Sequence, residues 1–466
     1  MTQFRISQSI NNSSPGFQGE VKELEGLLRD IQPQHHPKII SFSQRIDNLD
    51  PLDFLATISL TKQLYFYWEN PRQSEAIIAY GTIRCLKLNS ADRFRRSQQF
   101  INNCLTEILT IGDLQLPGSG PHFFCSFSFF EQQRKEAQFP SATIFLPEIQ
   151  IYCQKNSTVL VINTLAKNLN KINLIISKIK AKVNTKITIN HEKKNTYLTI
   201  QDKDREFKQS VNSALTSIEQ KKFSKIVLAH AIDLTASQPF NLIKSLQNLR
   251  QQHPDCYLFA TSNGEDIHFI GASPERLLTI NNKQLITDAL AGSAPRGKTV
   301  EEDKQIGELL LNNEKERREH EAVREFIQQR LRQLGLEPKI MPLELLQLAN
   351  IQHLWTAIYA EIPPRLHPLD IVAQLHPTPA VAGVPTETAC QEIRRYESFE
   401  RSLYAAPIGW LDYQGNSKFI VGIRSALIQG NQARLYGGAG IVAGSTPDKE
   451  YAEVQLKLQS LLKTLV

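Results

Sequence analysis

The sequence has few of the features that mark a secreted, membrane or metal-ribbon protein. Its six cysteines are scattered, with no C-x-x-C pair and no paired Cys/His spacing, which argues against zinc ribbons and thioredoxin-type redox sites. Free, buried thiols in a reducing compartment are the better interpretation. No apolar run approaches the roughly 18 residues of a membrane span. Because a secretory hydrophobic segment is also missing, we expect a cytoplasmic protein with no membrane partner.

An excess of charge of one sign is also missing. Lys and Arg number 53 and Asp and Glu number 47, so the formal net charge is only +6 over 466 residues. A dedicated nucleic-acid binder concentrates far more positive charge, and we expect no nucleic-acid partner. A helix predicted over residues 165–183 carries several lysines, but no aromatic residues are interleaved with them for base stacking, so a solvated helix face is the simpler interpretation.

The sequence does have the composition of a large globular protein. Hydrophobic residues make up 41% and charged residues 21% of a chain that is long enough for two ordinary domains or one large core. Residues 1–200 are predicted to form a divergent N-terminal part with little chemistry, and residues 201–466 the catalytic region. In this second region, short strands and two well-marked helices alternate without strict βαβ order, which favours an antiparallel or mixed α+β core.

Two predicted helices carry paired acidic residues. Residues 301–334 are expected to form one long helix, in which Glu316 and Glu319 project on the stripe that is apolar one turn later. In the last helix Glu450 lies near the apolar stripe and Glu453 on its flank. Buried like charges are costly without a cation or a proton, and two E-x-x-E pairs offer oxygen ligands for Mg²⁺. Surface ion pairing with neighbouring basic residues is the alternative that spacing leaves open.

Two predicted strands carry ionisable groups in apolar surroundings. Lys225 begins an apolar run to Ile232, and a desolvated lysine can act as a base near neutral pH. A strand-end lysine that reaches solvent is the plainer interpretation. Residues 267–278 are predicted as strand, tight turn and strand, with Glu275 just past the turn. A carboxyl group between apolar strands keeps its proton and can serve as an acid, although turn glutamates are also common.

A glycine-rich segment begins at Gly438 and has the spacing of a dinucleotide-binding loop. The helix after it is the last predicted element, so the second strand and ribose-binding acid of such a site have no place, and NAD(P) is excluded. We expect instead a loop that offers backbone N–H groups to an anion. Arg424, on a strand predicted over residues 419–427, and Lys457 suit carboxylate binding. A cationic pocket beside a Mg²⁺ site indicates a small polycarboxylate.

A series of short motifs supports this interpretation. In chain order from about residue 205 to 460 they are SKIVLA at 224–229, GASPERL at 271–277, LAGS at 290–293, KERREH at 315–320, HL at 353–354, HPTPA at 376–380, LY at 403–404, IR at 423–424, GAGIV at 438–442 and E-x-x-E at 450–453. In this series the sequence resembles the chorismate-utilising enzymes, and among them the isochorismate synthases. The N-terminal part is similar only in general character.

The resemblance implies a core of twisted, mainly antiparallel sheets with helices outside, and a Mg²⁺-dependent conversion of chorismate to isochorismate. It implies that Lys225 deprotonates the water that enters at ring C2, and that Glu275 protonates the hydroxyl group that leaves C4. Glu319 and Glu453 are the implied Mg²⁺ ligands, with Glu316 and Glu450 behind them. The implied substrate contacts are Ser293, His353, Tyr404, Arg424, Gly438 and Lys457.

Two positions indicate the branch of the family. Relatives that use ammonia lack the lysine matching Lys225, and aminodeoxychorismate synthases place a nucleophilic lysine where Ala291 stands, so water is the expected nucleophile. Synthesis of isochorismate for menaquinone or phylloquinone is therefore expected, by a monomer or weak homodimer. The alternatives are a salicylate synthase that also releases pyruvate, isochorismate supply for a siderophore, and a non-catalytic basic binding protein. Two residues depart from the family pattern: His230 replaces a usual arginine and Glu316 a frequent aspartate.

Overall fold

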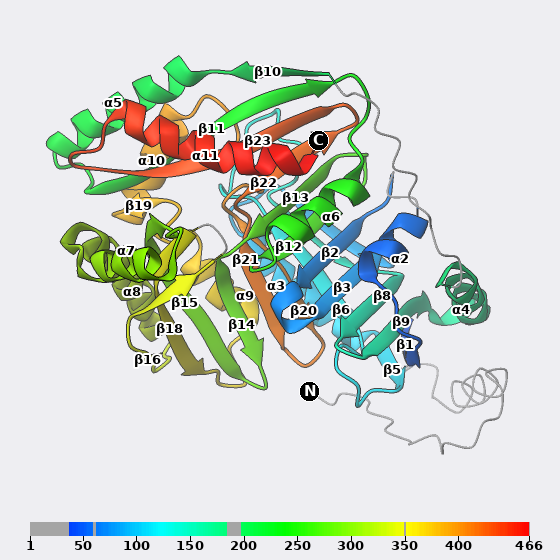
Figure 1. Ribbon diagram of the computed structural model, residues 1–466. Helices are drawn as coiled ribbons and strands as arrows, with labels where there is room; N and C mark the ends of the chain where they lie inside the picture. Colours follow the sequence, from blue (N-terminus) through cyan, green and yellow to red (C-terminus); the bar gives the residue numbers. More distant parts are fainter. Residues whose placement is uncertain (1–36, 59–61, 184–196, 349–350, 466) are drawn as a thin grey trace.

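Two large β-sheets with helices on their outer faces make up the computed structural model, which describes residues 37–58, 62–183, 197–348 and 351–465 (Figure 1). The first sheet has 13 strands, in the spatial order β10 (Leu198–Asp202), β11 (Lys225–Ala236), β23 (Gln432–Val442), β22 (Ser425–Gln429), β13 (His268–Ser273), β12 (Tyr257–Ser262), β2 (Tyr65–Asn70), β3 (Glu75–Tyr80), β8 (Ile149–Gln154), β9 (Ser157–Leu165), β1 (Ile39–Ile46) and β5 (Ile108–Gly112), with β19 (Gly383–Val384) beside β11.

The second sheet has 10 strands. Their order is β16 (Lys339–Ile340), β18 (Ile351–Glu361), β15 (Gln284–Pro295), β14 (Arg276–Asn281), β21 (Ser417–Val421), β20 (Pro407–Asp412), β6 (His122–Phe127), β7 (Ala142–Leu146) and β4 (Arg84–Leu88), with β17 (Glu344–Gln347) beside β18. Among the described strands, only β1 and β5 pair in parallel. The predicted α+β fold with mainly antiparallel sheets and outer helices is therefore confirmed.

Helices cover the outer faces of both sheets. They are α2 (Pro51–Thr57), α3 (Arg93–Thr106), α4 (Asn170–Val183), α5 (Asp204–Glu219), α6 (Leu242–Gln252), α7 (Val300–Asn312), α8 (Glu314–Gln333), α9 (Pro368–Leu375), α10 (Thr386–Tyr396) and α11 (Pro447–Leu465), with short 3₁₀ turns η2 (Pro71–Gln73) and η3 (Ala166–Asn168). The helices α5, α6 and α11 contact the first sheet, while α3 and α9 contact the second. In Figure 1, α5 and α11 lie together along the top of the molecule and α7 and α8 at its left.

The hydrophobic core lies between the two sheets. Trp68 of β2 packs edge-on against Trp410 of β20, with ring centroids 6.5 Å apart, and Phe66 packs against Phe124 of β6 at 5.0 Å. Every residue of β2, β6 and β7 is buried, which explains why these strands are apolar runs rather than alternating patterns. Since β2 pairs with β12 and β6 with β20, both sheets mix strands from before and after residue 200. The division of the chain at residue 200 stays a prediction.

The chain passes between the sheets at two neighbouring corners. It leaves the first sheet after β13 and enters the second at β14, and it returns from β21 to β22. The corners are tied together, because the Val421 N–H donates to the Glu275 carbonyl (3.0 Å) and the Ala272 N–H donates to the Arg424 carbonyl (3.1 Å). The Ser273 hydroxyl donates to the Val421 carbonyl at 2.6 Å. The strand, turn and strand predicted over residues 267–278 are therefore present as β13, a corner and β14, and the structure adds that the two strands belong to different sheets, which diverge at Glu275.

The predicted long helix over residues 301–334 is two helices. The backbone of Asn313 is extended, with φ −74° and ψ 113°, and it ends α7 and begins α8. The Asn313 side chain accepts a hydrogen bond from the Glu316 N–H at 3.1 Å, as an N-cap does. The spacing of apolar residues did not predict this break, because the capping residue Asn313 is polar and is not part of the apolar face of the helix. The predicted face of α8 is unaffected, and Val323 and Ile327 are buried on it.

Two further predictions near the site are wrong. The strand predicted over residues 419–427 is interrupted, because Arg424 has a left-handed backbone (φ 49°) between β21 and β22. The expected glycine loop is not a loop, because Gly438 and Gly440 lie within β23. Their missing side chains leave space for neighbours: a Cβ on Gly438 would be 2.7 Å from the Tyr404 hydroxyl oxygen, and a Cβ on Gly440 would be 3.2 Å from Lys225 Cε.

The helix predicted over residues 165–183 begins at Asn170 after η3, and the last predicted helix is α11, which begins at Pro447. Residues 191–204, a polar segment of the sequence, lie partly outside the described residues, and the described part contains β10. All six cysteines are free as predicted, but only Cys104, Cys125 and Cys256 are buried; Cys153 and Cys390 are partly buried and Cys85 is exposed. Among the described helices, none is long and apolar enough to cross a membrane.

Candidate active site

One cavity, where the two sheets diverge, is lined by all of the residues predicted for the site. Its volume is 280 Å³. The predicted residues in its lining are Lys225, Glu275, Ser293, Glu316, Glu319, His353, Tyr404, Arg424, Gly438, Glu450, Glu453 and Lys457. They come from β11, β15, β18 and β23, from α8 and α11, and from the connections between strands. Residues more than 200 positions apart in the sequence therefore meet in one place.

Lys225 begins β11, next to β23. Residues Lys225 and Val227 lie on the inner face of the strand, and Val227 pairs with Gly440. The lysine side chain runs across Gly440, where any larger residue would displace it. Its Nζ donates a hydrogen bond of 2.8 Å to Glu319 Oε2 of α8, and only 7% of the residue is exposed. The amine is therefore buried and ion-paired, rather than the solvent-reaching lysine of the alternative interpretation.

Glu275 lies at the corner between β13 and β14 and is 8% exposed. Burial raises the pKa of its carboxyl group to about 7, and the negative charge of Asp288 acts in the same direction, while Lys225 opposes both. Asp288 is itself held by two hydrogen bonds from Arg276, at 2.7 and 2.9 Å, and by one from the Trp355 indole N–H at 2.9 Å. The shift favours the protonated carboxyl group, which is the form that a general acid requires.

Two further cationic side chains, Arg424 and Lys457, line the cavity. Arg424 occupies the second corner, and its Nη1 contacts the sulfur of the buried Cys256 at 3.7 Å. Lys457 of α11 donates to the Gly438 carbonyl and to Glu453, both at 2.8 Å. Burial, with the charges of Arg424 and Lys457, lowers the pKa of His353 to about 3, so its imidazole is neutral. Arg424 and Lys457 can bind anionic groups of a substrate, and His353 can contribute only neutral hydrogen bonds.

Four carboxylates line one side of the cavity, two from α8 and two from α11. Burial raises the pKa of Glu316 and that of Glu450. The negative charge of Glu319 raises the pKa of Glu316 further, and that of Glu453 raises the pKa of Glu450 further. Glu316 Oε2 also accepts the N–H of Ser293 at 3.2 Å. Within the described ranges, no three His, Cys, Asp or Glu side chains surround a common point. Mg²⁺ prefers oxygen ligands and needs only one or two carboxylates beside water and substrate oxygens, so the chemistry of these four side chains is compatible with Mg²⁺.

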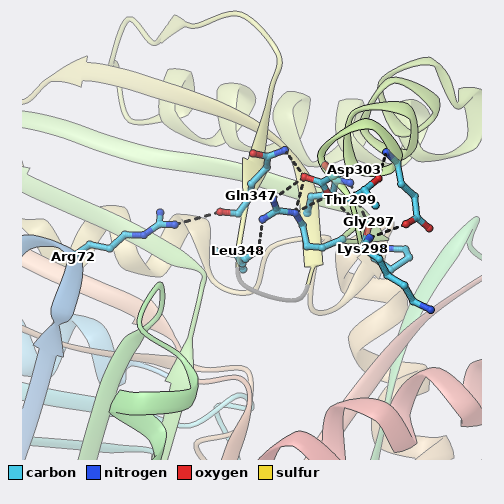
Figure 2. Close-up of polar contacts among 11 residues, drawn as sticks. Arg72, Gly297, Lys298, Thr299, Asp303, Gln347 and Leu348 are labelled. Carbon is cyan, nitrogen blue, oxygen red and sulfur yellow. Dashed lines mark hydrogen bonds and ion pairs between the residues drawn. The ribbon is translucent and has the colours of Figure 1, made fainter.

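A polar network holds the connection between β15 and α7 (Figure 2). Arg296 pairs with Asp303 at 2.7 Å, and its Nη1 donates to the Leu348 carbonyl at 2.6 Å. Asp303 also accepts the Gly297 N–H at 2.8 Å, and Arg72 reaches the neighbouring Gln347 carbonyl at 3.2 Å. The network therefore holds the end of β17, at Gln347 and Leu348, against α7. The strand β17 pairs with β18, in which His353 lies opposite Ser293 of β15.

Sequence reasoning missed some of the cavity's lining. Tyr436 lies in it and stacks on Tyr404, with ring centroids 5.1 Å apart. A two-residue period from Gly438 and Gly440 would have placed Tyr436 on the same face. His230, which replaces a usual arginine, faces the opposite side of β11 and contacts Asp202 at 2.7 Å. The substitution therefore does not change the lining directly.

A larger cavity of 580 Å³ lies farther along the same strands and shares Tyr436 with the first. Its charged residues include Asp233 and Arg434, which pair with each other at 2.7 Å. It contains none of the predicted site residues. We therefore place the candidate site in the smaller cavity, which is lined by the buried Lys225, by Glu275 with its raised pKa and by the four carboxylates.

Comparison with known proteins gives a consistent result. The family model described as "Chorismate binding enzyme" matches residues 26–466. The chain is 31% identical to isochorismate synthase MenF of Bacillus subtilis, covering 95% of this chain and 97% of that protein. It is 32% identical to the salicylate biosynthesis isochorismate synthase of Pseudomonas aeruginosa, covering 95% and 93%. The solved structure of MenF, the menaquinone-specific isochorismate synthase from Escherichia coli, superposes with a TM-score of 0.78 at 28% identity, covering 96% of this chain and 99% of that one.

Proposed function

The chain belongs to the family of chorismate-binding enzymes, and from this premise we propose that it is an isochorismate synthase. It converts chorismate to isochorismate: the oxygen of a water molecule bonds to ring C2 while the bond between C4 and its hydroxyl group breaks. The observation that carries the proposal is that the buried Lys225 and the proton-bearing Glu275 line one cavity. The extent and identity of the match to proteins named isochorismate synthase support it.

In the proposed mechanism, Lys225 takes the proton of the attacking water and Glu275 gives its proton to the departing hydroxyl group, which leaves as water. The balance is complete, because one proton enters the protein at the lysine and one leaves at the glutamate. The lysine needs a free lone pair, so it has to leave its ion pair with Glu319 during the reaction. Such acid and base placement contributes roughly 10²–10⁴ in rate.

We propose that Glu319 and Glu453 hold Mg²⁺, with Glu316 and Glu450 adjusting their position. Both proposed ligands already contact a cation, since Glu319 pairs with Lys225 and Glu453 pairs with Lys457. Bound Mg²⁺ would neutralise and orient the ring carboxylate of the substrate. Burial and, after it, the neighbouring carboxylates raise the pKa of Glu316 and Glu450, and a cation at this place would favour their charged forms.

The other proposed substrate contacts surround the two carboxylates of chorismate. Arg424 suits bidentate binding of a carboxylate, and Lys457 adds a second cation. The Tyr404 hydroxyl and the backbone of Gly438 lie beside each other and offer hydrogen bonds. Ser293 and His353 face each other across β15 and β18. These groups would hold the ring between the proposed acid and base, where orientation matters most.

We infer that the product supplies quinone synthesis, that is, menaquinone or phylloquinone. The solved Escherichia structure, whose description is menaquinone-specific, supports menaquinone, and the Bacillus relative shares the name MenF with it. The Pseudomonas relative, named for salicylate biosynthesis, favours salicylate supply as the alternative. The cytoplasmic location and the monomer or weak homodimer stay predictions from the sequence.

Incubation of the purified protein with chorismate tests the function. With Mg²⁺, isochorismate is expected as the one product by liquid chromatography, and EDTA should abolish it. Salicylate with an equal amount of pyruvate would indicate a salicylate synthase instead. No turnover of chorismate in the presence of Mg²⁺ would overturn the proposal.

A further inference from the structure

A buried ion pair lies directly behind the cavity. Arg401 and Glu397 are joined by two hydrogen bonds, of 2.6 Å from Nη2 and 2.9 Å from Nε. Their side chains are only 1% and 3% exposed. A buried pair of this kind contributes little net stability, because the cost of desolvating both charges offsets their attraction. The pair needs another explanation, and its remaining contacts supply one.

The pair completes an open edge of β11. On this edge β19 pairs with Lys225 and Ile226, and β10 pairs with residues 232–236. In the gap between these strands, the Val227 carbonyl accepts from Arg401 Nη2 and the Ala229 N–H donates to Glu397 Oε1, both at 2.7 Å. The Val227 N–H still donates to the Ala382 carbonyl, at 2.8 Å, so the two side chains replace the missing strand only at the Val227 carbonyl and the Ala229 N–H, two and four residues after Lys225.

The same guanidinium group reaches two other parts of the cavity wall. Its Nη1 donates to the carbonyl of Val381, which lines the cavity, at 3.0 Å. Its planar group lies 5.8 Å from the ring centroid of Tyr404 and 4.3 Å from that of Phe129. The Tyr404 N–H in turn donates to the Arg401 carbonyl at 2.8 Å. One side chain thus connects the strand of Lys225, the segment at Val381 and the ring of Tyr404.

From these contacts we propose that Arg401 and Glu397 are positioning residues, which hold Lys225 and Tyr404 in register across the cavity. The inference rests on the proposed function. The pair acts through geometry rather than charge, because its two charges neutralise each other. A displacement of about 1 Å in a reacting group can cost roughly 10²-fold in rate. A planar guanidinium is required, since its three separate nitrogens reach four acceptor atoms on Glu397, Val227 and Val381, which the single nitrogen of an ammonium group cannot span.

The test compares kcat and KM for folded enzyme with chorismate and Mg²⁺, at a temperature where circular dichroism shows each variant folded. For Arg401→Met we expect kcat to fall about 30-fold or more and KM to change less than about threefold. Arg401→Lys should recover part of the loss, and Glu397→Gln, which keeps an acceptor for Ala229, should lose less than Arg401→Met. If Arg401→Met does not fold, Arg401→Lys carries the test, with an expected loss of about tenfold.

Leu160→Ala is the matched control for lost stability. Leu160 is fully buried in β9 and does not line the cavity, so this substitution should lower the melting temperature and leave kcat within about twofold. If the folded Arg401 variants also keep kcat within twofold of the wild type, the pair is only structural and the inference is wrong. If the wild type itself produces no isochorismate, the proposed function fails, which is a separate outcome.

Discussion

Replacing Glu275 by glutamine is expected to stabilise the protein above pH 7 while removing most of its activity. Burial and the charge of Asp288 raise the pKa of the Glu275 carboxyl group from 4.5 to about 7, although Lys225 opposes them. Between these two values, the folded protein binds a proton that the unfolded chain has already lost. The stability of the wild type therefore falls as the pH rises through this window, and glutamine, which does not ionise, carries no such cost.

The magnitude follows from the size of the shift. The difference between about 7 and 4.5 is 2.5 pKa units, which at roughly 1.36 kcal/mol per unit amounts to about 3 kcal/mol at pH 8. An unfolding entropy of about 2.1 cal/mol/K per residue gives about 1 kcal/mol/K for 466 residues. The melting temperature of Glu275→Gln should therefore exceed that of the wild type by about 3 °C at pH 8 and by less than about 1 °C at pH 5.

The assay is a set of thermal melts of both proteins from pH 5 to pH 8, without substrate or Mg²⁺ and at one scan rate. Taking the difference between the two proteins at each pH cancels the other titrating groups. Glu265→Gln is the matched control, because it makes the same chemical change at an exposed side chain. The reasoning is refuted if the difference for Glu275→Gln is independent of pH, or if this variant is the less stable protein at pH 8.

Four further outcomes are expected. Lys225→Ala should lower kcat by roughly 10²–10⁴ with an unchanged circular dichroism spectrum, and more than about a tenth of the wild-type turnover would remove its role as the base. Glu319→Gln should raise the Mg²⁺ concentration for half-maximal turnover about tenfold or more, and an unchanged titration would contradict the proposed ligand. Asp288→Asn removes a charge that raises the pKa of Glu275, so the alkaline limb of the pH profile of kcat/KM should move to lower pH by roughly 0.5–1 unit. An unmoved limb would contradict the role of Glu275 as the general acid. Gly440→Ala should lower kcat about tenfold, because its Cβ would meet Lys225 Cε at 3.2 Å, and wild-type turnover would show that the lysine has room to move.

Features that depend on neighbouring residues could be predicted from the sequence. The start of β11 at Lys225 and of α11 at Pro447 follow from apolar runs and capping residues, which act within a few positions. The buried stripe of α8, with Val323 and Ile327, follows from the helical period. The predictions failed where a single polar residue or a break decided the path of the chain, as at Asn313 and Arg424.

The partners of the charged groups could not be predicted. Lys225 pairs with Glu319, 94 residues away, because the helix α8 packs over β15 and β18 and its start faces β11 across the cavity. Arg401 and Glu397 gave no signal, since an acid and a base four positions apart are common on exposed surfaces. Only the packed structure shows that this pair is buried and that it fills an open strand edge.

The sequence by itself determined which chemical groups are available and which side of each strand or helix they occupy, because backbone periodicity is a local property. The tertiary structure alone decided that Glu275 lies where two sheets separate, next to Asp288 and Lys225, and so keeps its proton near neutral pH. The physical reason is that a pKa depends on burial and on nearby charges, and both arise from contacts between distant segments of the chain.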